Sequence, residues 1–253
     1  MTDEEIKKAD PYVNPKTGIA VAKFERKARV ASYQIGAAGN IRLSALLRME
    51  QETGEEHMDG IGMGYEWLMK EQKAFLITTN QVTIHRLPQR NEQLTIVTRP
   101  LGTSGVQFYR EFSFQSEGKE IVRILQVSVV VDFVEHKPLR PDKIYQYRIF
   151  CPLQAEKKER PERLRFEEMP KLGDRPIRYS DLDRNGHLTN TIYGDIIEDF
   201  LPETFRNYHH VQINYQKESK LGDTLELFGE VHNGGFAMQG IHHGEIGFTA
   251  FIS

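Results

Sequence analysis

The sequence predicts an α+β fold built from two similar halves, each with one long helix held against an antiparallel sheet. Two observations lead to this prediction. A helix-like pattern followed by several strand-like patterns occurs in the first half of the chain and again in the second half. The segments Val82–Leu94 and Ile213–Leu225 also align with each other without a gap. Two such halves in one chain would form a pseudo-dimer with two-fold symmetry.

In the first half, apolar residues recur at helical spacing over Leu43–Glu52, which predicts a helix. A second, shorter helix is expected over Gly64–Lys73, around the single Trp67. Alternating and β-branched residues predict the strands of this half. The expected strands are Ala22–Gln34, Phe75–Arg86, Gln93–Pro100, Val106–Gln115 and Glu120–Val134.

In the second half, one apolar stripe predicts a helix over Leu188–Leu201, which Pro202 would end. A helix held by an antiparallel sheet is the hot-dog arrangement, so we expect a tandem double hot-dog. The expected strands of this half are Pro176–Ser180, His210–Lys217, Thr224–Val231, Ala237–His242 and Glu245–Ile252. The expected domains are an N-terminal hot-dog domain (residues 1–137), a Pro-rich charged linker (138–173) and a C-terminal hot-dog domain (174–253).

The composition narrows the class of protein. The chain has 253 residues and a formal net charge of −3, which gives no reason to expect a nucleic-acid partner. Its charged start contains no apolar signal segment, and no apolar run approaches the length of a membrane span. Cys151 is the only cysteine, so no intrachain disulfide is expected. These features predict a reduced cytoplasmic protein.

The segment Tyr179–Pro202 is unusually dense in polar residues directly before the predicted helix. Backbone N–H groups at a helix N-terminus are unpaired and the helix dipole favours negative charge there, so an oxyanion could be held at this point. The same dipole would keep the imidazole of His187 neutral. The polar residues are Asp181, Asp183, Asn185, His187, Asn190 and Tyr193.

Metal-binding interpretations of the sequence fail on spacing. The run from Asp181 resembles a calcium-binding loop, but Ile192 stands where that loop needs a bidentate glutamate. The pairs His209–His210 and His242–His243 are adjacent residues of predicted strands, and adjacent strand residues point to opposite faces. We therefore expect no metal site and no cofactor.

The motif in this segment is similar to one in the acyl-acyl carrier protein (ACP) thioesterases of plants and bacteria. That family's second half contains S-D-L-D-x-N-x-H-x-x-N-x-x-Y, and every position is matched from Ser180 to Tyr193. Ser32–Gly36 similarly resembles the family's first-strand signature. The resemblance implies hydrolysis of fatty acyl-ACP thioesters to free fatty acid and ACP, which ends fatty acid elongation. The implied partner is an ACP that carries a 4′-phosphopantetheine thioester.

Aligning the two halves indicates which of them carries the site. In the first half Gly36, Ala38 and Asn40 occupy the places of Asp183, Asn185 and His187, and Leu87–Pro88 occupies that of Glu218–Ser219. Only the second half keeps groups that can move a proton, so we expect one active site per chain. The first half then becomes a candidate for the wall of the acyl pocket.

The resemblance marks Asp183, Asn185, His187 and Glu218 as catalytic. Plant relatives have Glu-Cys where this chain has Glu218–Ser219, and Cys151 lies in the linker, so a cysteine nucleophile is not expected. An unactivated serine hydroxyl is a poor nucleophile. We expect water activated by Glu218 or Asp183, with Asn185 and His187 in positioning roles. The residues expected to bind substrate or support the site are Ser219, Asn190 and Tyr193.

Alternatives stay open at this stage. A hot-dog hydratase or dehydratase would use a similar His and carboxylate on acyl thioesters, and a non-catalytic acyl-binding module would need neither. The basic part of the linker, Lys157–Arg165, fits either a solvated connection or a docking patch for an acidic carrier. The sequence does not specify the acyl chain length, the choice between ACP and coenzyme A, or whether the chain forms a homodimer.

Overall fold

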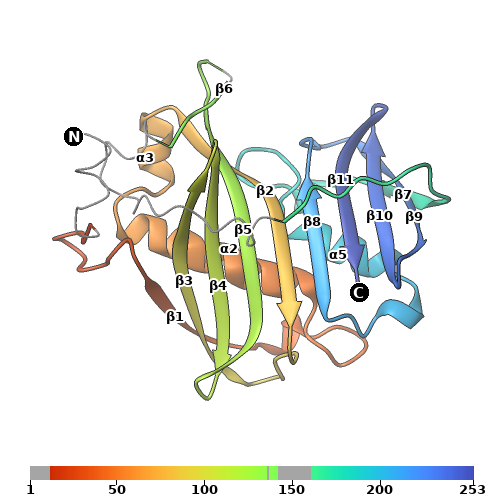
Figure 1. The fold of residues 1–253 in the computed structure, drawn as a ribbon, viewed down its shortest axis with the longest axis horizontal. Coiled ribbons are helices and arrows are strands. Elements are labelled where there is room, and N and C mark those ends of the chain that lie inside the picture. The colour runs from red at the N-terminus through yellow and green to blue at the C-terminus, as the bar shows by residue number, and fades with distance from the viewer. Residues whose placement is uncertain (1–11, 136, 142–160) are drawn as a thin grey trace. The chain divides into compact units, whose positions relative to one another are not determined.

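A computed structural model of the chain describes residues 12–135, 137–141 and 161–253. Figure 1 shows the strands and the helices that lie against them. The helices are α2 (Leu43–Gly60), α3 (Tyr65–Lys70) and α5 (Ile192–Phe200), with short 3-10 turns η1 (Ser32–Gln34), η3 (Tyr179–Asp181) and η4 (Glu203–Phe205). The strands are β1 (Phe24–Arg29), β2 (Lys73–Ile84), β3 (Gln93–Ser104), β4 (Gln107–Ser116), β5 (Lys119–Asp132), β6 (Lys137–Pro138), β7 (Lys171–Pro176), β8 (His210–Tyr215), β9 (Thr224–His232), β10 (Gly235–His242) and β11 (Glu245–Ile252).

The strands form one antiparallel sheet, in the order β1-β3-β4-β5-β2-β8-β11-β10-β9-β7, with β6 paired to β5. Each half of the chain supplies one principal helix and its own set of strands, which confirms the predicted tandem double hot-dog. Within the described residues, none of the helices has the length and apolarity to cross a lipid bilayer.

The compact units of the structure do not coincide with the two halves of the sequence. Among the described residues, one unit contains 12–29, 50–78, 93–135 and 137–141, and the other contains 30–49, 79–92 and 161–253. The predicted domain limits (1–137, 138–173 and 174–253) therefore stay a prediction. Residues 142–160 of the linker, with Cys151 and most of the basic run, lie outside the described residues.

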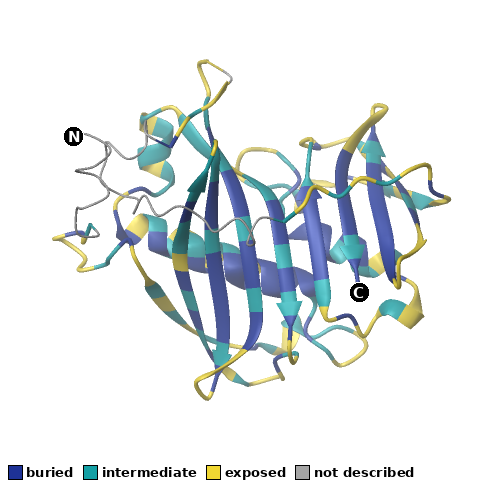
Figure 2. Cartoon of the chain, viewed as in Figure 1, coloured by how far each residue is buried: buried dark blue, intermediate teal, exposed yellow. Residues whose placement is uncertain are grey.

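The first unit is built on long antiparallel pairings of β3 with β4 and of β4 with β5. Many residues of these strands are buried, as the dark blue parts of the ribbon in Figure 2 show. Phe112 and Phe114 of β4 are fully buried, and the Phe112 ring lies beside Gly54 of α2.

A polar cluster is buried in the same unit, between α2 and the strands. Arg110 of β4 donates a hydrogen bond from Nη1 to His57 Nδ1 at 2.8 Å, so the other ring nitrogen carries the proton and donates to the Ala20 carbonyl at 2.9 Å. Glu50 is also buried, accepts a hydrogen bond from Gln126, and favours the charged form of Arg110. Burial, reinforced by Arg110, lowers the pKa of His57 to about 4.

His57 should make the protein less stable in mild acid. An unfolded chain protonates this histidine near pH 6.5, whereas the folded chain keeps it neutral down to about pH 4, so the unfolded state binds more protons between these values. The contribution of neutral His57 to the free energy of unfolding is fully present above pH 6.5. About 3 kcal/mol of this contribution is lost by pH 4. In urea titrations across this range, His57→Gln should show a shallower loss of stability than the wild type. An identical pH dependence in both proteins would contradict the assignment, and the exposed His232→Gln is the matched control.

The principal helix of the second unit is shorter than the sequence suggested. The prediction of a helix over Leu188–Leu201 is wrong at its start, because α5 begins at Ile192 after the N-cap Thr191. Leu188 is instead extended: it pairs with Leu182, and its N–H donates to the Ser219 carbonyl at 2.8 Å. These pairings use the backbone groups that a helix would have needed.

Other element limits also need correction. Helix α2 continues to Gly60 rather than ending at Glu52, with Thr53 and His57 buried along its inward side. The strand predicted over Pro176–Ser180 lies earlier, at β7, and η3 follows it. The strand predicted over Ala22–Gln34 is shorter, because it ends at Arg29 before η1. Polar residues at inward helix positions and short turns after strands both weaken the periodicity on which these predictions rested.

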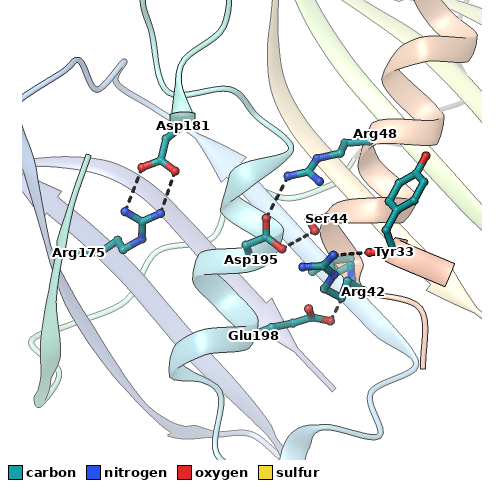
Figure 3. A network of polar contacts seen from close by, with 9 residues as sticks. Tyr33, Arg42, Ser44, Arg48, Arg175, Asp181, Asp195 and Glu198 are labelled. Atoms are coloured by element: carbon teal, nitrogen blue, oxygen red, sulfur yellow. Dashed lines mark hydrogen bonds and ion pairs between the residues drawn. The ribbon is translucent and has the colours of Figure 1, made fainter. Parts of the chain in front are cut away.

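Acidic residues of α5 hold the first turn of α2 within the second unit (Figure 3). Glu198 accepts the unpaired N–H of Leu43 at 2.9 Å, and Asp195 accepts a hydrogen bond from Ser44 at 2.5 Å. Asp195 also pairs with Arg48 at 3.2 Å. The four N–H groups at a helix start lack partners within the helix, so Glu198 acts as an N-terminal cap, while Asp195 binds side chains of the first turns. Burial raises the pKa of Glu198, and its hydrogen bonds oppose that shift.

Candidate active site

The predicted motif forms a tight turn between η3 and α5. The Asp183 N–H donates to the His187 carbonyl at 2.8 Å, which closes the turn. The Asp183 carboxylate accepts the backbone N–H groups of Asn185 at 2.8 Å and of His187 at 3.0 Å through the same oxygen, Oδ1. This Asx-type bonding fixes the backbone of the motif. It also leaves the imidazole of His187 half-buried and the side chain of Asn185 exposed.

A second segment, between β8 and β9, brings Glu218 to this turn. His187 pairs with Lys220 as an antiparallel bridge, next to the hydrogen bond from Leu188 to Ser219. These backbone contacts place His187 Nε2 at 3.3 Å from Glu218 Oε2. The structure therefore brings together the imidazole and the carboxylate that the sequence nominated from separate segments.

The two candidate carboxylates differ in what they already bind. Asp183 accepts two backbone N–H groups, and its second oxygen lies 3.4 Å from the side-chain nitrogen of Asn185. The Glu218 side chain is 51 % exposed and contacts His187. Because a general base must reach a water molecule, Glu218 is better placed to act as one and Asp183 is better placed to hold the turn.

The three supporting residues lie at different depths. Tyr193 is buried on α5 with its ring against Tyr215 and Phe248 at 5.2 and 5.0 Å, and burial raises its pKa to about 12. Ser219 is fully buried near Tyr193, and its hydroxyl forms no hydrogen bond of normal geometry among the described residues. Asn190 does not occupy the helix N-cap, which is Thr191; its carbonyl accepts a hydrogen bond from Tyr215 at 3.3 Å.

The helix-dipole argument for His187 is wrong. His187 lies four residues before the N-cap Thr191, with Leu188 extended between them, and the dipole of a helix acts mainly within its first turn. The group that faces His187 is the carboxylate of Glu218 instead.

An ion pair next to the motif was not identified from the sequence. Arg175 donates two parallel hydrogen bonds, each 3.0 Å long, to the two carboxylate oxygens of Asp181 (Figure 3). The Asp181 carboxylate also accepts the backbone N–H of Arg178 at 2.9 Å and is almost fully buried. Asp181 is therefore a structural residue that fixes the entry to the turn. The sequence shows Arg175 shortly before the motif. Whether its side chain reaches Asp181 depends on the direction of η3, which the sequence does not give.

The first copy of the motif repeats this backbone without the reactive side chains. The Gly36 N–H donates to the Asn40 carbonyl at 2.8 Å, as Asp183 does to His187, and η1 precedes that turn as η3 precedes this one. The copies therefore share the same turn, but only the second carries a carboxylate and an imidazole on it. This asymmetry is the structural counterpart of the one seen in the alignment of the halves.

Comparison with known proteins places this fold and motif in a family. Residues 21–146 match the acyl-ACP thioesterase N-terminal domain, and residues 167–246 match the acyl-ACP thioesterase C-terminal domain. These matches define the class of protein, a tandem hot-dog protein of the acyl-ACP thioesterase kind. The chain belongs to the acyl-ACP thioesterase family.

Similar proteins come from plants and bacteria. Oleoyl-acyl carrier protein thioesterase 1 of Arabidopsis thaliana, a chloroplastic protein, is 22% identical over 226 residues, which span 80% of this chain and 62% of that relative. An acyl-ACP thioesterase from Bacteroides thetaiotaomicron has the same fold (TM-score 0.79, 18% identity, covering 91% of this chain and 96% of that one). A putative oleoyl thioesterase from Lactobacillus plantarum is equally similar (TM-score 0.80, 22% identity, 92% and 95% covered).

Proposed function

We propose that the protein hydrolyses fatty acyl-ACP thioesters to free fatty acid and ACP, and that this reaction ends fatty acid elongation. The observation that carries the proposal is the contact of 3.3 Å between His187 and Glu218, which exists on only one of two otherwise similar turns. Membership of the family supports the acyl-ACP substrate. The substrate-binding group on ACP would be the 4′-phosphopantetheine arm that carries the thioester.

The first step in the proposed mechanism is attack by water. Glu218 takes a proton from a water molecule as the water oxygen bonds to the thioester carbonyl carbon. His187 accepts or donates a hydrogen bond at this water and holds Glu218 in position through their contact. The exposed side-chain amide of Asn185 lies 3.4 Å from Asp183 Oδ2 and has two N–H donors, one of which donates to the oxygen that becomes negative.

The second step breaks the carbon–sulfur bond. The tetrahedral intermediate collapses, its oxygen regains the double bond, and the sulfur leaves with the bonding electrons. The proton held by Glu218 returns through His187 to the departing thiolate, so that the site is ready for another cycle. The products are a carboxylic acid and the free thiol of the carrier.

The assignment of the acyl pocket to the N-terminal half, residues 1–137, stays a prediction. Whether the chain forms a homodimer is a separate question, which size-exclusion chromatography with light scattering would test. The basic part of the linker as an ACP-docking patch also stays a prediction, because most of it lies outside the described residues.

Product analysis tests the proposed reaction. With palmitoyl-ACP and oleoyl-ACP, we expect free fatty acid and free thiol to appear in equal amounts. With a 3-hydroxyacyl-ACP, we expect no enoyl thioester, whereas a hydratase or dehydratase would form one and release no thiol. Retention of every thioester unchanged would favour an acyl-binding module. The same chains on coenzyme A distinguish between the two carriers.

Replacing Cys151 with Ala should leave turnover within about two-fold of the wild type, because Ser219 rather than a cysteine stands next to Glu218. Steady-state kinetics on an acyl-ACP measures this directly. Ser219→Ala is the companion variant, since it removes the hydroxyl at the family's cysteine position. Loss of all activity in Cys151→Ala with an unchanged melting curve would show that the nucleophile is wrongly assigned.

A further inference from the structure

The turn after β10 brings two neighbouring histidines to one side of the chain. His242 is the last residue of β10, and His243 has a positive φ of 50°, so the strand ends between them. Their rings lie 5.4 Å apart at 73° to each other. The prediction that these two side chains point to opposite faces is therefore wrong, because the alternation of a strand does not continue into the turn.

Asp223 lies against both rings. Its Oδ1 is 2.9 Å from His243 Nε2, and its Oδ2 is 3.8 Å from His242 Nδ1. One donor atom from each of the three residues lies within 4.8 Å of the other two. Asp223 directly precedes β9, His242 ends β10, and His243 lies in the turn that joins β10 to β11.

His242 lacks the hydrogen bonds that a buried imidazole requires. It is 3 % exposed, and neither of its ring nitrogens has a hydrogen-bond partner among the described residues. The backbone of Lys217 lies near the ring without forming a bond of normal geometry. A Cβ at position 247 would lie 3.0 Å from Cδ2 of the His242 ring. Because Gly247 has no Cβ, the His242 ring can occupy this space. An unpaired buried nitrogen is costly unless an ion or a water molecule binds it.

Comparison with the first copy of this turn shows that Asp223 lacks the cationic partner of its equivalent residue. Glu92 occupies the equivalent position, and both carboxylates accept a backbone N–H from the residue three positions before them. Glu92 is also neutralised by Arg86 at 2.5 Å. In the second copy Lys217 takes the place of Arg86 but pairs with Glu245 instead. The negative charge of Asp223 therefore faces two imidazoles rather than a permanent cation.

We propose that Asp223, His242 and His243 form a binding site for a divalent first-row transition metal ion, with Zn²⁺ the best fit. Two imidazole nitrogens and one carboxylate are ligands that suit Zn²⁺, whereas Ca²⁺ and Mg²⁺ prefer sets of oxygen ligands. Bonds of about 2.0–2.2 Å place the ligand atoms of a tetrahedral ion roughly 3.3–3.6 Å apart, so a small rotation of the exposed His243 completes the set. Water would fill the fourth position.

The charges around the site are compatible with a cation. A metal ion binds the unprotonated forms of histidine and aspartate, and no other described carboxylate or imidazole pairs with this cluster. Lys217 opposes a cation, and its pairing with Glu245 offsets much of that charge. A bound ion would join the turn before β9 to the β10–β11 turn. Glu218 lies on the same segment as Asp223, between β8 and β9.

Metal titration of the full chain, with any affinity tag removed, tests the site. We expect the wild type to bind one equivalent of Co²⁺, with the absorption of tetrahedral nitrogen and oxygen ligation, and to exchange it for Zn²⁺. The melting temperature should rise as Zn²⁺ is added, because the ion binds only the folded chain. His243→Ala should weaken Zn²⁺ binding at least 10-fold without unfolding the protein, because His243 is 70 % exposed.

Two further variants separate this site from other metal binding. Asp223→Asn should weaken binding as His243→Ala does, whereas the exposed His232→Ala should bind Zn²⁺ like the wild type. Unchanged affinity in both His243→Ala and Asp223→Asn would overturn the proposal, as would no binding by the wild type at millimolar Zn²⁺. These measurements do not use turnover, so they stand or fall independently of thioester hydrolysis.

Discussion

Glu218→Gln is expected to lower kcat on an acyl-ACP by about 10²-fold or more, the range found when a general base is removed. Glutamine keeps the shape of the side chain and its contact with His187 but cannot take a proton from water. His187→Ala should lower kcat by a similar factor, because it removes the group that lies 3.3 Å from Glu218. KM should change little in Glu218→Gln, since the loss concerns the transition state.

Three controls make this experiment decisive. Asp183→Asn should have the smaller effect, because an amide oxygen can still accept the two backbone N–H groups that hold the turn. Leu87→Ala, at the place of Glu218 in the first copy, should leave kcat close to that of the wild type. Glu230→Gln tests loss of an exposed carboxylate elsewhere in the second unit. If Asp183→Asn abolishes turnover and Glu218→Gln does not, Asp183 is the base.

Gly194→Ala should cause a large loss of stability for a change of one methyl group. A Cβ on Gly194 would lie 2.6 Å from the backbone nitrogen of Ser44 and 2.8 Å from its Cα. Backbone atoms cannot rotate away, so α5 or the start of α2 would have to shift. We expect the free energy of unfolding to fall by about 3 kcal/mol, the upper part of the usual range for overpacking. Thermal melts should show a drop of about 2–4 °C for each kcal/mol.

Gly54→Ala is the matched control for this prediction. Gly54 also lies within a helix, but its Cβ would meet only the edge of the Phe112 ring, at an ordinary 3.4 Å. Alanine favours the helix over glycine, so this variant should be unchanged or more stable by up to about 1 kcal/mol. A Gly194→Ala protein as stable as the wild type would show that α5 and α2 approach less closely than the structure indicates.

The duplicated order of elements made the fold predictable from the sequence. It gave the antiparallel strands, the two principal helices and the place where the halves differ. The motif then nominated His187, and the resemblance to the family's Glu-Cys pair nominated Glu218, which lies far from His187 in sequence. Their mutual distance could not be predicted, because it depends on the pairing of His187 with Lys220.

Features that depend on local backbone geometry were missed. The start of α5 was misjudged because Leu188 fits an apolar helix stripe and a buried extended segment equally well. The pairing of Glu198 with the N–H of Leu43 joins residues far apart in the chain and has no sequence signal beyond an acidic helix face. The approach of His242 to His243 needed the positive φ of His243, which histidine adopts only uncommonly.

The division of α2 and β2 between the two compact units bears on how the protein folds. Each of these elements begins in one unit and ends in the other, and the chain passes between the units repeatedly. A half produced alone would therefore lack part of a unit and expose unpaired strand edges, so it should aggregate rather than fold. Unfolding of one unit would also pull on a helix and a strand of the other. We expect one cooperative transition for the whole chain, although its sequence consists of two similar halves.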